Sequence, residues 1–295
     1  MGDVLEELSF RALNLATASH DRAERGDFGA RSVHATRAGA KRLRALWQLL
    51  RPAIDAGVAD DANVRLRDSN RLLAPARDAH VARKTTSKLL AKCARGKDRK
   101  ALRAFRDTLP AASKHTPAVV NVLGLAAVYR EELAAWRSLA IDASDQAVIY
   151  SGMRRAYGKG QRLARKAIAS GGPSSYHRWR KWVKYLLYQL EALDPRLLGW
   201  QRDYALLLDR LGDALGKYND LQNLREQALS SDLSRPTRRR VSALVDERAR
   251  RIRRRCQKLH VDVYRARPEI FAASIARAVA APERIAVSLV NIAGE

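Results

Sequence analysis

The chain of 295 residues is 46% hydrophobic and 29% charged, a composition typical of folded proteins and unlike that of disordered ones. Its 56 Lys and Arg residues outnumber 31 Asp and Glu residues, which leaves a formal net charge of +25. Such a surplus favours a polyanionic partner, such as nucleic acid, an anionic membrane or polyphosphate. The two cysteines, Cys93 and Cys256, are too few for a disulfide framework and lack metal-ligand spacing.

The N-terminal residues carry no secretion signal, because residues 1–10 include acidic side chains and lack the apolar core of a signal peptide. No run of about 18 apolar residues occurs, so no transmembrane helix is predicted. We therefore expect a soluble cytoplasmic protein that does not bind membranes.

Ala, Leu, Arg and Lys dominate the chain, and alternating β-branched patterns are nearly absent, which predicts an all-α fold. Pro and Gly fall between the helical stretches, as at Pro52, Gly171 and Pro236. In chain order, the predicted helices cover residues 3–24, 32–50, 60–75, 78–108, 118–139, 145–169, 175–193, 200–216, 218–230 and 236–266, with a weaker helix near 269–280.

One basic phrase occurs twice, in residues 32–52 and in residues 175–195. Both copies place His, Arg and Lys at the same intervals. The six residues are His34, Arg37 and Lys41 in the first phrase and His177, Arg180 and Lys184 in the second, each pair 143 residues apart (177 − 34, 180 − 37, 184 − 41). A solvated helix face has no reason to keep its spacing in both copies, so the repetition indicates a binding role.

On a helical wheel, the cations of each phrase fall on one side and the large apolar residues on the other. Arg44 joins the basic side of the first phrase, and Lys181 joins that of the second. Each basic stripe spans about 15 Å at 1.5 Å per residue. Ser32 and Ser175 stand where N-caps are expected, which would place each histidine in the first turn of its helix.

The repetition extends beyond these phrases. Residues 11–22 align with 154–165, and residues 66–81 align with 208–223. A period this long indicates a duplicated domain rather than a solenoid. We expect two homologous helical halves, joined near residues 139–147, that pack about a pseudo-two-fold axis and bring both basic stripes to a shared surface.

The duplicated phrases and their companions resemble the CHAD family, the conserved histidine α-helical domain. The matching stretches are H-x-x-R-x-x-x-K-R-L-R-A-L at 34–46, A-P-A-R-D at 74–78, G-M-R-R-A-Y at 152–157, the second His-x-x-Arg-x-x-x-Lys at 177–184 and L-G-K-Y-N-D-L at 215–221. The resemblance implies an all-α fold of two bundle-like halves whose basic residues line a central groove or pore. It also implies binding of inorganic polyphosphate without catalysis.

The resemblance sets the expected domain organisation. We expect one CHAD domain over residues 3–266, made of repeats at about 3–139 and 145–266, followed by a C-terminal extension at 267–295. The sequence predicts no oligomeric state.

Polyphosphate offers only oxygen atoms, so its binders need repeated cations, with Arg for bidentate contacts and Lys as a point charge. The candidate ligands are His34, Arg37, Lys41, Arg42 and Arg44 from the first phrase, His177, Arg180, Lys181 and Lys184 from the second, and Arg11, Arg22, Arg154, Arg155, Lys159, Arg162 and Arg165 from the helices before them. In the second phrase Tyr185 and Leu187 stand where the first has Arg42 and Arg44, so we expect a weaker contribution from the second half.

Three classes of function compete. The first is a non-catalytic polyphosphate binder, associated with polyphosphate granules, for which phosphate, sulfate and other polyanions are further candidate ligands. The second is a nucleic-acid-binding protein that uses the same basic surface, although the stripes lack interleaved aromatics and no known nucleic-acid motif occurs. The third is an enzyme of phosphate metabolism, but the chain lacks a Walker loop and a carboxylate cluster for Mg²⁺. We expect no catalysis, no metal and no cofactor.

Three further features stay open. The Arg-rich segment 238–258 is either a solvated helix face or part of a binding surface. Asp78 and Asp220 lack a visible carboxylate partner, which favours a helix cap or an ion pair with an arginine over acid–base chemistry. The apolar tail 281–292 is either an additional packing helix or a partner contact.

Overall fold

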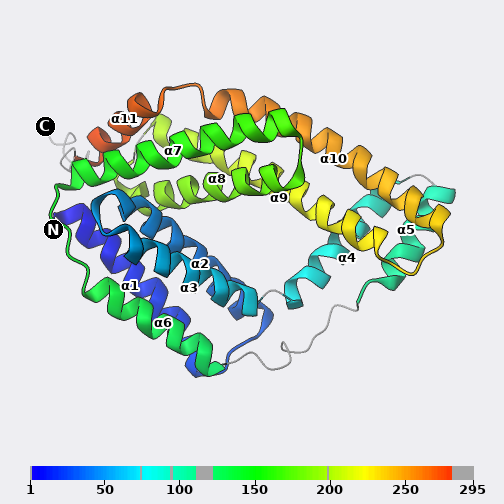
Figure 1. Ribbon diagram of the computed structural model, residues 1–295, viewed down its shortest axis with the longest axis horizontal. Helices are drawn as coiled ribbons and strands as arrows, with labels where there is room; N and C mark the ends of the chain where they lie inside the picture. Colours follow the sequence, from blue (N-terminus) through cyan, green and yellow to red (C-terminus); the bar gives the residue numbers. More distant parts are fainter. Residues whose placement is uncertain (1, 74, 94–95, 111–121, 198, 281–295) are drawn as a thin grey trace, which may run out of the picture.

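The computed structural model describes residues 2–73, 75–93, 96–110, 122–197 and 199–280, with only the backbone described at 75–80 and 122–123 (Figure 1). Within these ranges the regular structure is entirely helical, which confirms the all-α prediction. None of the described helices is long and apolar enough to cross a membrane. The tail 281–292 and the side chain of Asp78 lie outside the described part of the chain.

The described helices are α1 (Asp3–Glu24), α2 (Ala30–Leu50), the 3-10 helix η1 (Arg51–Ala53), α3 (Ala56–Leu72), α4 (Pro75–Lys92), α5 (Lys97–Thr108), α6 (Val122–Arg137), α7 (Asp145–Ser170), α8 (Pro173–Leu193), the 3-10 helix η2 (Asp194–Arg196), α9 (Trp200–Leu229), α10 (Arg235–Val263) and α11 (Pro268–Ala280).

Two predicted helix boundaries were wrong, both because of glycine. The predicted helix 78–108 is two helices, α4 and α5, and α5 follows Gly96, whose φ of 122° suits only glycine. Conversely, the predicted break near residue 217 does not exist, and α9 runs without interruption. A methyl group at Gly216 would lie 3.4 Å from Nε of Arg180 of α8. The glycine there provides room for a crossing side chain and does not end the helix.

The predicted N-caps were also wrong. Gly29 caps α2 and Gly172 caps α8, so Ser32 and Ser175 lie inside their helices. Ser32 instead donates from Oγ to Oδ2 of Asp27 at 2.6 Å. Each phrase histidine consequently lies one turn further from the helix start than expected, where the N-terminal dipole is weaker.

The helices form two groups that meet at α2 and α8 (Figure 1). In one group α1 packs against α2 and α6, and α2 packs against α3. In the other, α7 packs on α8 and α11, and α9 packs on α8 and α10. Helices α4 and α5, although early in the chain, pack against α9 and α10. Trp47 of α2 and Trp179 of α8 are completely buried, as their apolar wheel positions predicted.

The order of elements recurs along the chain. Helix α2 ends at Leu50 and is followed at once by η1, while α8 ends at Leu193 and is followed at once by η2, each boundary being 143 residues later (193 − 50, 194 − 51). Pro52 and Pro195 occupy the same position in these 3-10 turns. The pseudo-two-fold axis itself stays a prediction.

Candidate functional site

The cations of the first phrase project toward α3. Arg37 is only 8% exposed, and its Nη1 donates to the backbone oxygen of Asn70 at the end of α3. Arg44 donates from Nε to Oδ1 of Asn63 at 3.0 Å. The structure thus holds two predicted ligands in fixed orientations, and Arg37 has little surface left to offer a ligand.

The cations of the second phrase run along α9. His177 Nδ1 lies 2.9 Å from Oδ1 of Asn219, and Lys184 Nζ forms an ion pair with Oδ1 of Asp209 at 2.9 Å. Arg180 crosses α9 at Gly216. These side chains are therefore ordered by α9, the helix that the sequence predicted to be broken.

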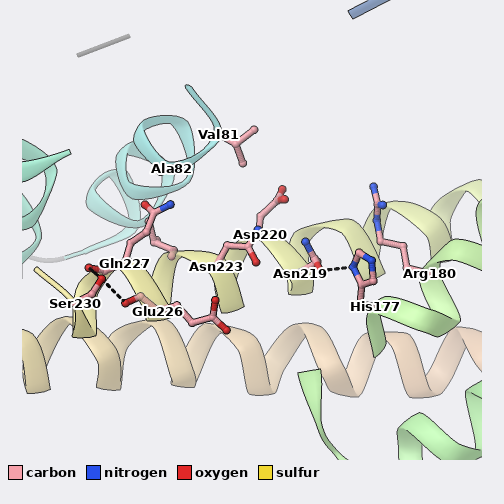
Figure 2. A pocket seen from close by; sticks show the side chains of 11 residues that line it. Val81, Ala82, His177, Arg180, Asn219, Asp220, Asn223, Glu226, Gln227 and Ser230 are labelled. Atoms are coloured by element: carbon pink, nitrogen blue, oxygen red, sulfur yellow. Dashed lines mark hydrogen bonds between the residues drawn. The ribbon is translucent and has the colours of Figure 1, made fainter. Parts of the chain in front are cut away.

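His177 and Arg180 line one end of a cavity of about 480 Å³ between α4, α8 and α9. Figure 2 shows the two side chains beside Asn219 and Asp220, with Gln227 and Ser230 at the opposite end. Because Asp220 and Glu226 also line this cavity, its charge is mixed rather than purely positive.

A more strongly positive group of side chains surrounds Lys181 of α8. Desolvation by the surrounding protein lowers the pKa of Lys181, and three neighbouring cations lower it further. These neighbours are Arg44 and Arg67 from the first half and Lys159 from α7 of the second. We call Arg44, Arg67, Lys159 and Lys181 the inter-half cluster. A depressed lysine pKa shows that the local potential is positive enough to oppose protonation.

Next to the inter-half cluster lies a cavity of about 370 Å³, here called the α7–α8 cleft. Its cationic lining residues are Arg155, Lys159, Lys166, Arg178 and Lys181. Among the described lining residues the one carboxylate is Asp60, which already forms an ion pair with Arg51 at 2.6 Å. The cleft therefore has a large excess of positive charge.

Aromatic residues support the cations of the α7–α8 cleft. The Arg155 guanidinium carbon lies 5.1 Å from the centre of the Trp182 ring, and Lys159 Nζ lies 5.9 Å from it. Arg155 Nη1 also donates to Oε1 of Gln48 at 2.9 Å, and burial, with a smaller effect from Arg51, lowers the pKa of Arg155. Cation–π contacts hold these groups in place without neutralising them.

A second cleft, the α1–α2 cleft, has a volume of about 670 Å³. The predicted residues that line it are Arg11, Arg22, His34 and Arg42. Acidic neighbours already bind two of these arginines. Arg11 pairs with Glu7 at 2.7 Å, and Arg42 pairs with Glu191 at 3.1 Å. This cleft has weaker uncompensated charge than the α7–α8 cleft.

The remaining predicted cations of α7 lie on another face. Arg154 and Arg162 line a cavity between α7 and the start of α11, where Arg154 pairs with Glu269 at 3.0 Å. Arg165 donates to Gln161 of its own helix at 3.0 Å. The sixteen predicted residues are thus spread over several surfaces. Lys41 is half-buried on α2 and lines none of the cavities described above.

Three residues that the sequence did not predict belong to the candidate site. Arg67 joins the inter-half cluster, and Lys166 and Arg178 line the α7–α8 cleft. The duplicated pattern could not reveal Arg178, because residue 35 at the matching position of the first half is Ala35. In the described part of the chain, no group of three or more His, Cys, Asp or Glu residues could hold a metal ion.

Comparison with known proteins places the chain. No curated protein matches it. The family model for the CHAD domain matches residues 11–229 of the 295, a span that includes both basic phrases and both clefts' lining helices. This domain is associated with polyphosphate binding generally. The match covers well over half of the sequence, and the chain belongs to the CHAD domain family.

Proposed function

We propose that this protein binds inorganic polyphosphate, without catalysis, at the inter-half cluster and the adjoining α7–α8 cleft. The carrying observation is the position of Lys181 among Arg44, Arg67 and Lys159. Cations gathered in this way repel one another, and a polyanion laid among them converts that repulsion into attraction.

The chemistry of the cluster suits a chain of phosphates. Arg44 and Arg67 can make bidentate contacts to phosphate oxygens, whereas Lys159 and Lys181 act as mobile point charges. The cations come from α2, α3, α7 and α8, so a chain bound there would contact both halves of the domain. Binding of the anion should favour the charged form of Lys181 and so raise its pKa.

We further propose that the halves are related by a pseudo-two-fold axis at the α2–α8 contact, with a basic central groove formed by both. The lining of the two clefts supports this relation. Four lining positions match at an offset of 143, namely Ala35 with Arg178, Ala38 with Lys181, Gly39 with Trp182 and Arg42 with Tyr185. In this arrangement the domain comprises residues 3–266, and its cellular role is association with cytoplasmic polyphosphate granules.

The proposal is tested with the double variant Arg44→Gln, Lys181→Gln, which removes one cation of the inter-half cluster from each half. The matched control is Arg154→Gln, Arg165→Gln, two exposed cations of α7 outside the cluster. With fluorescent long-chain polyphosphate, we expect roughly tenfold or greater weakening for the cluster variant, since charge-assisted contacts contribute about 1.5–3 kcal/mol each. The control should change the affinity by less than about threefold.

Two further outcomes bear on the proposal. Duplex DNA at equal phosphate concentration should not displace polyphosphate, and incubation with Mg²⁺ should release no phosphate. Equal weakening in both variants would replace the defined site by diffuse attraction. Ready displacement by DNA would favour a nucleic-acid-binding function for the same surface, and phosphate release would show catalysis.

A further inference from the structure

A second concentration of positive charge lies on α10, beyond the residues that the family model matches. Five exposed cations follow one another within nine residues. They are Arg250, Arg251, Arg254, Arg255 and Lys258, here called the α10 patch. Helix α10 runs along the edge of the molecule in Figure 1, packed on α9 and α5. It contributes no residue to the inter-half cluster or to either cleft.

The α10 patch is weakly neutralised. Glu247 forms an ion pair with Arg251 across one turn of the helix. No carboxylate of the described residues forms an ion pair with the other four cations. Since exposed ion pairs contribute little, the patch keeps most of its charge.

The apolar side of α10 is not available to a partner. Val241, Val245, Ile252 and Cys256 are buried against the rest of the protein. A helix that binds a membrane inserts its apolar face, and here that face is already occupied. Beyond the patch, Val261 is a single exposed apolar residue. The exposed side of α10 therefore recognises a partner through charge.

The geometry of the patch favours a duplex over a single chain. At 100° and 1.5 Å per residue, the five cations cover an arc of about 140° and a length of about 12 Å. One linear chain follows a single row of cations, whereas a groove of duplex DNA presents a phosphate backbone on each side. The density of about one cation per 2.4 Å is comparable to one phosphate per 1.7 Å of duplex axis.

Single-stranded nucleic acid fits the patch less well, because its binders combine cations with aromatic platforms for the bases. Between Arg235 and Val263 the sequence of α10 contains no Phe, Trp or Tyr. The major groove of B-form DNA is about 12 Å wide and admits an α-helix, whereas that of A-form RNA is too narrow.

We propose that the α10 patch is a docking surface for the phosphates of double-stranded DNA, separate from the polyphosphate site. Contacts of this kind are independent of base sequence and strongly salt-dependent. The proposal does not depend on polyphosphate binding, because the two surfaces lie on different helices. Together they would allow one molecule to hold DNA on one face and a polyphosphate chain on another.

The test uses the full chain carrying Arg250→Gln, Arg251→Gln, Arg254→Gln and Arg255→Gln. The control removes the same charge elsewhere, by Lys84→Gln, Lys88→Gln, Lys92→Gln and Arg103→Gln, four exposed cations of α4 and α5. Binding of labelled duplex DNA is measured over a range of salt concentrations, and circular dichroism verifies that each variant is folded.

For the α10 variant we expect at least about tenfold weaker DNA binding and a salt dependence flattened by roughly 3 units of log K per log salt, since each phosphate contact contributes about 0.9. The control should keep the wild-type slope, and polyphosphate affinity should stay within about twofold for the α10 variant.

Absence of DNA binding by the wild-type chain at low salt would overturn the proposal. So would equal losses in the α10 and control variants, or tighter binding of anionic vesicles or of duplex RNA than of duplex DNA. Loss of polyphosphate binding in the α10 variant would count against the separation of the two sites. Because the Arg44→Gln, Lys181→Gln variant should keep full DNA affinity, failure of either site is seen independently of the other.

Discussion

The two clefts of this CHAD domain occupy equivalent positions in the two halves, yet they differ in charge. In the α1–α2 cleft the positions next to α2 are Ala35, Ala38 and Gly39, and Glu191 holds Arg42 in an ion pair. In the α7–α8 cleft the same positions carry Arg178, Lys181 and Trp182. The repeat preserved the shape of the domain, while its charge became concentrated in one half.

This difference changes how the duplicated phrases are interpreted. Several repeated cations are engaged within the protein, such as Arg37 with the carbonyl of Asn70 and Lys184 with Asp209. Cations found in only one half, such as Lys181 and Arg178, face a cleft with little acid. The repetition therefore marks the helices that frame the site, and the unrepeated residues supply much of its charge.

The largest expected effect comes from removing the charge of one cleft. Replacing Lys159, Lys166, Arg178 and Lys181 by Gln should weaken polyphosphate binding by about a thousandfold, as four contacts at about 1 kcal/mol each sum to about 4 kcal/mol. Fluorescence anisotropy with labelled polyphosphate measures the change.

The matched control for that variant is the other cleft, with Arg11, Arg22, His34 and Arg42 replaced by Gln. We expect less than about tenfold weakening, because acids already pair with two of these cations. If the two variants lose affinity equally, the clefts are equivalent in binding and the asymmetry of charge has no consequence.

The second effect concerns a polar pair that one half buries and the other lacks. Trp47 donates from Nε1 to Oε1 of the completely buried Glu132 at 2.5 Å, while Leu190 stands 143 residues after Trp47. Burial raises the pKa of Glu132 from 4.5 to about 7. The folded state thus holds a proton that the unfolded state releases, so this stability is complete below pH 4.5 and is lost as pH rises through about 7.

We expect Glu132 to cost the folded protein about 3 kcal/mol above that range, from a shift of about 2.5 units at 1.36 kcal/mol each. Glu132→Gln keeps the acceptor for Trp47 and should remove this pH dependence. Urea unfolding at pH 5 and pH 8 measures it, with Glu131→Gln as the exposed control. An unchanged difference between the two pH values in Glu132→Gln would show that Glu132 is ionised when buried.

The smallest effect is a gain. Introducing the charges of the second cleft into the first, by Ala35→Arg and Ala38→Lys, should tighten polyphosphate binding by about fivefold, because the new cations lie beside acids that take up part of their charge. Introducing the same residues at Ala127 and Ala134 of α6 provides the control. No gain, with helicity retained, would separate the position of a cation from its contribution.

The fold followed from the sequence where apolar periodicity and proline set the helix limits, as in α1 and α11. It did not follow at glycine, because the same residue ends one helix at Gly96 and accommodates Arg180 at Gly216. Backbone need and packing need are indistinguishable in the sequence, since both call for the absence of a side chain.

The site was predicted in part. The wheel separated Trp47 and Trp179 from the cations correctly, because burial follows helical period. It could not find Arg67 of the inter-half cluster, since the approach of α3 to α7 and α8 is a tertiary contact between elements distant in the chain. Nor could it show that Arg37 is buried, which depends on where α3 ends.

The most direct test of the central claim is the state of Lys181 with and without polyphosphate. Lysine-directed NMR, with the resonance assigned through Lys181→Arg, follows its titration. The account predicts a pKa below the ordinary lysine value in the free protein, because of desolvation and its cationic neighbours, and a clear rise when polyphosphate binds. Saturating polyphosphate that leaves the titration of Lys181 unchanged would contradict a binding site at the inter-half cluster.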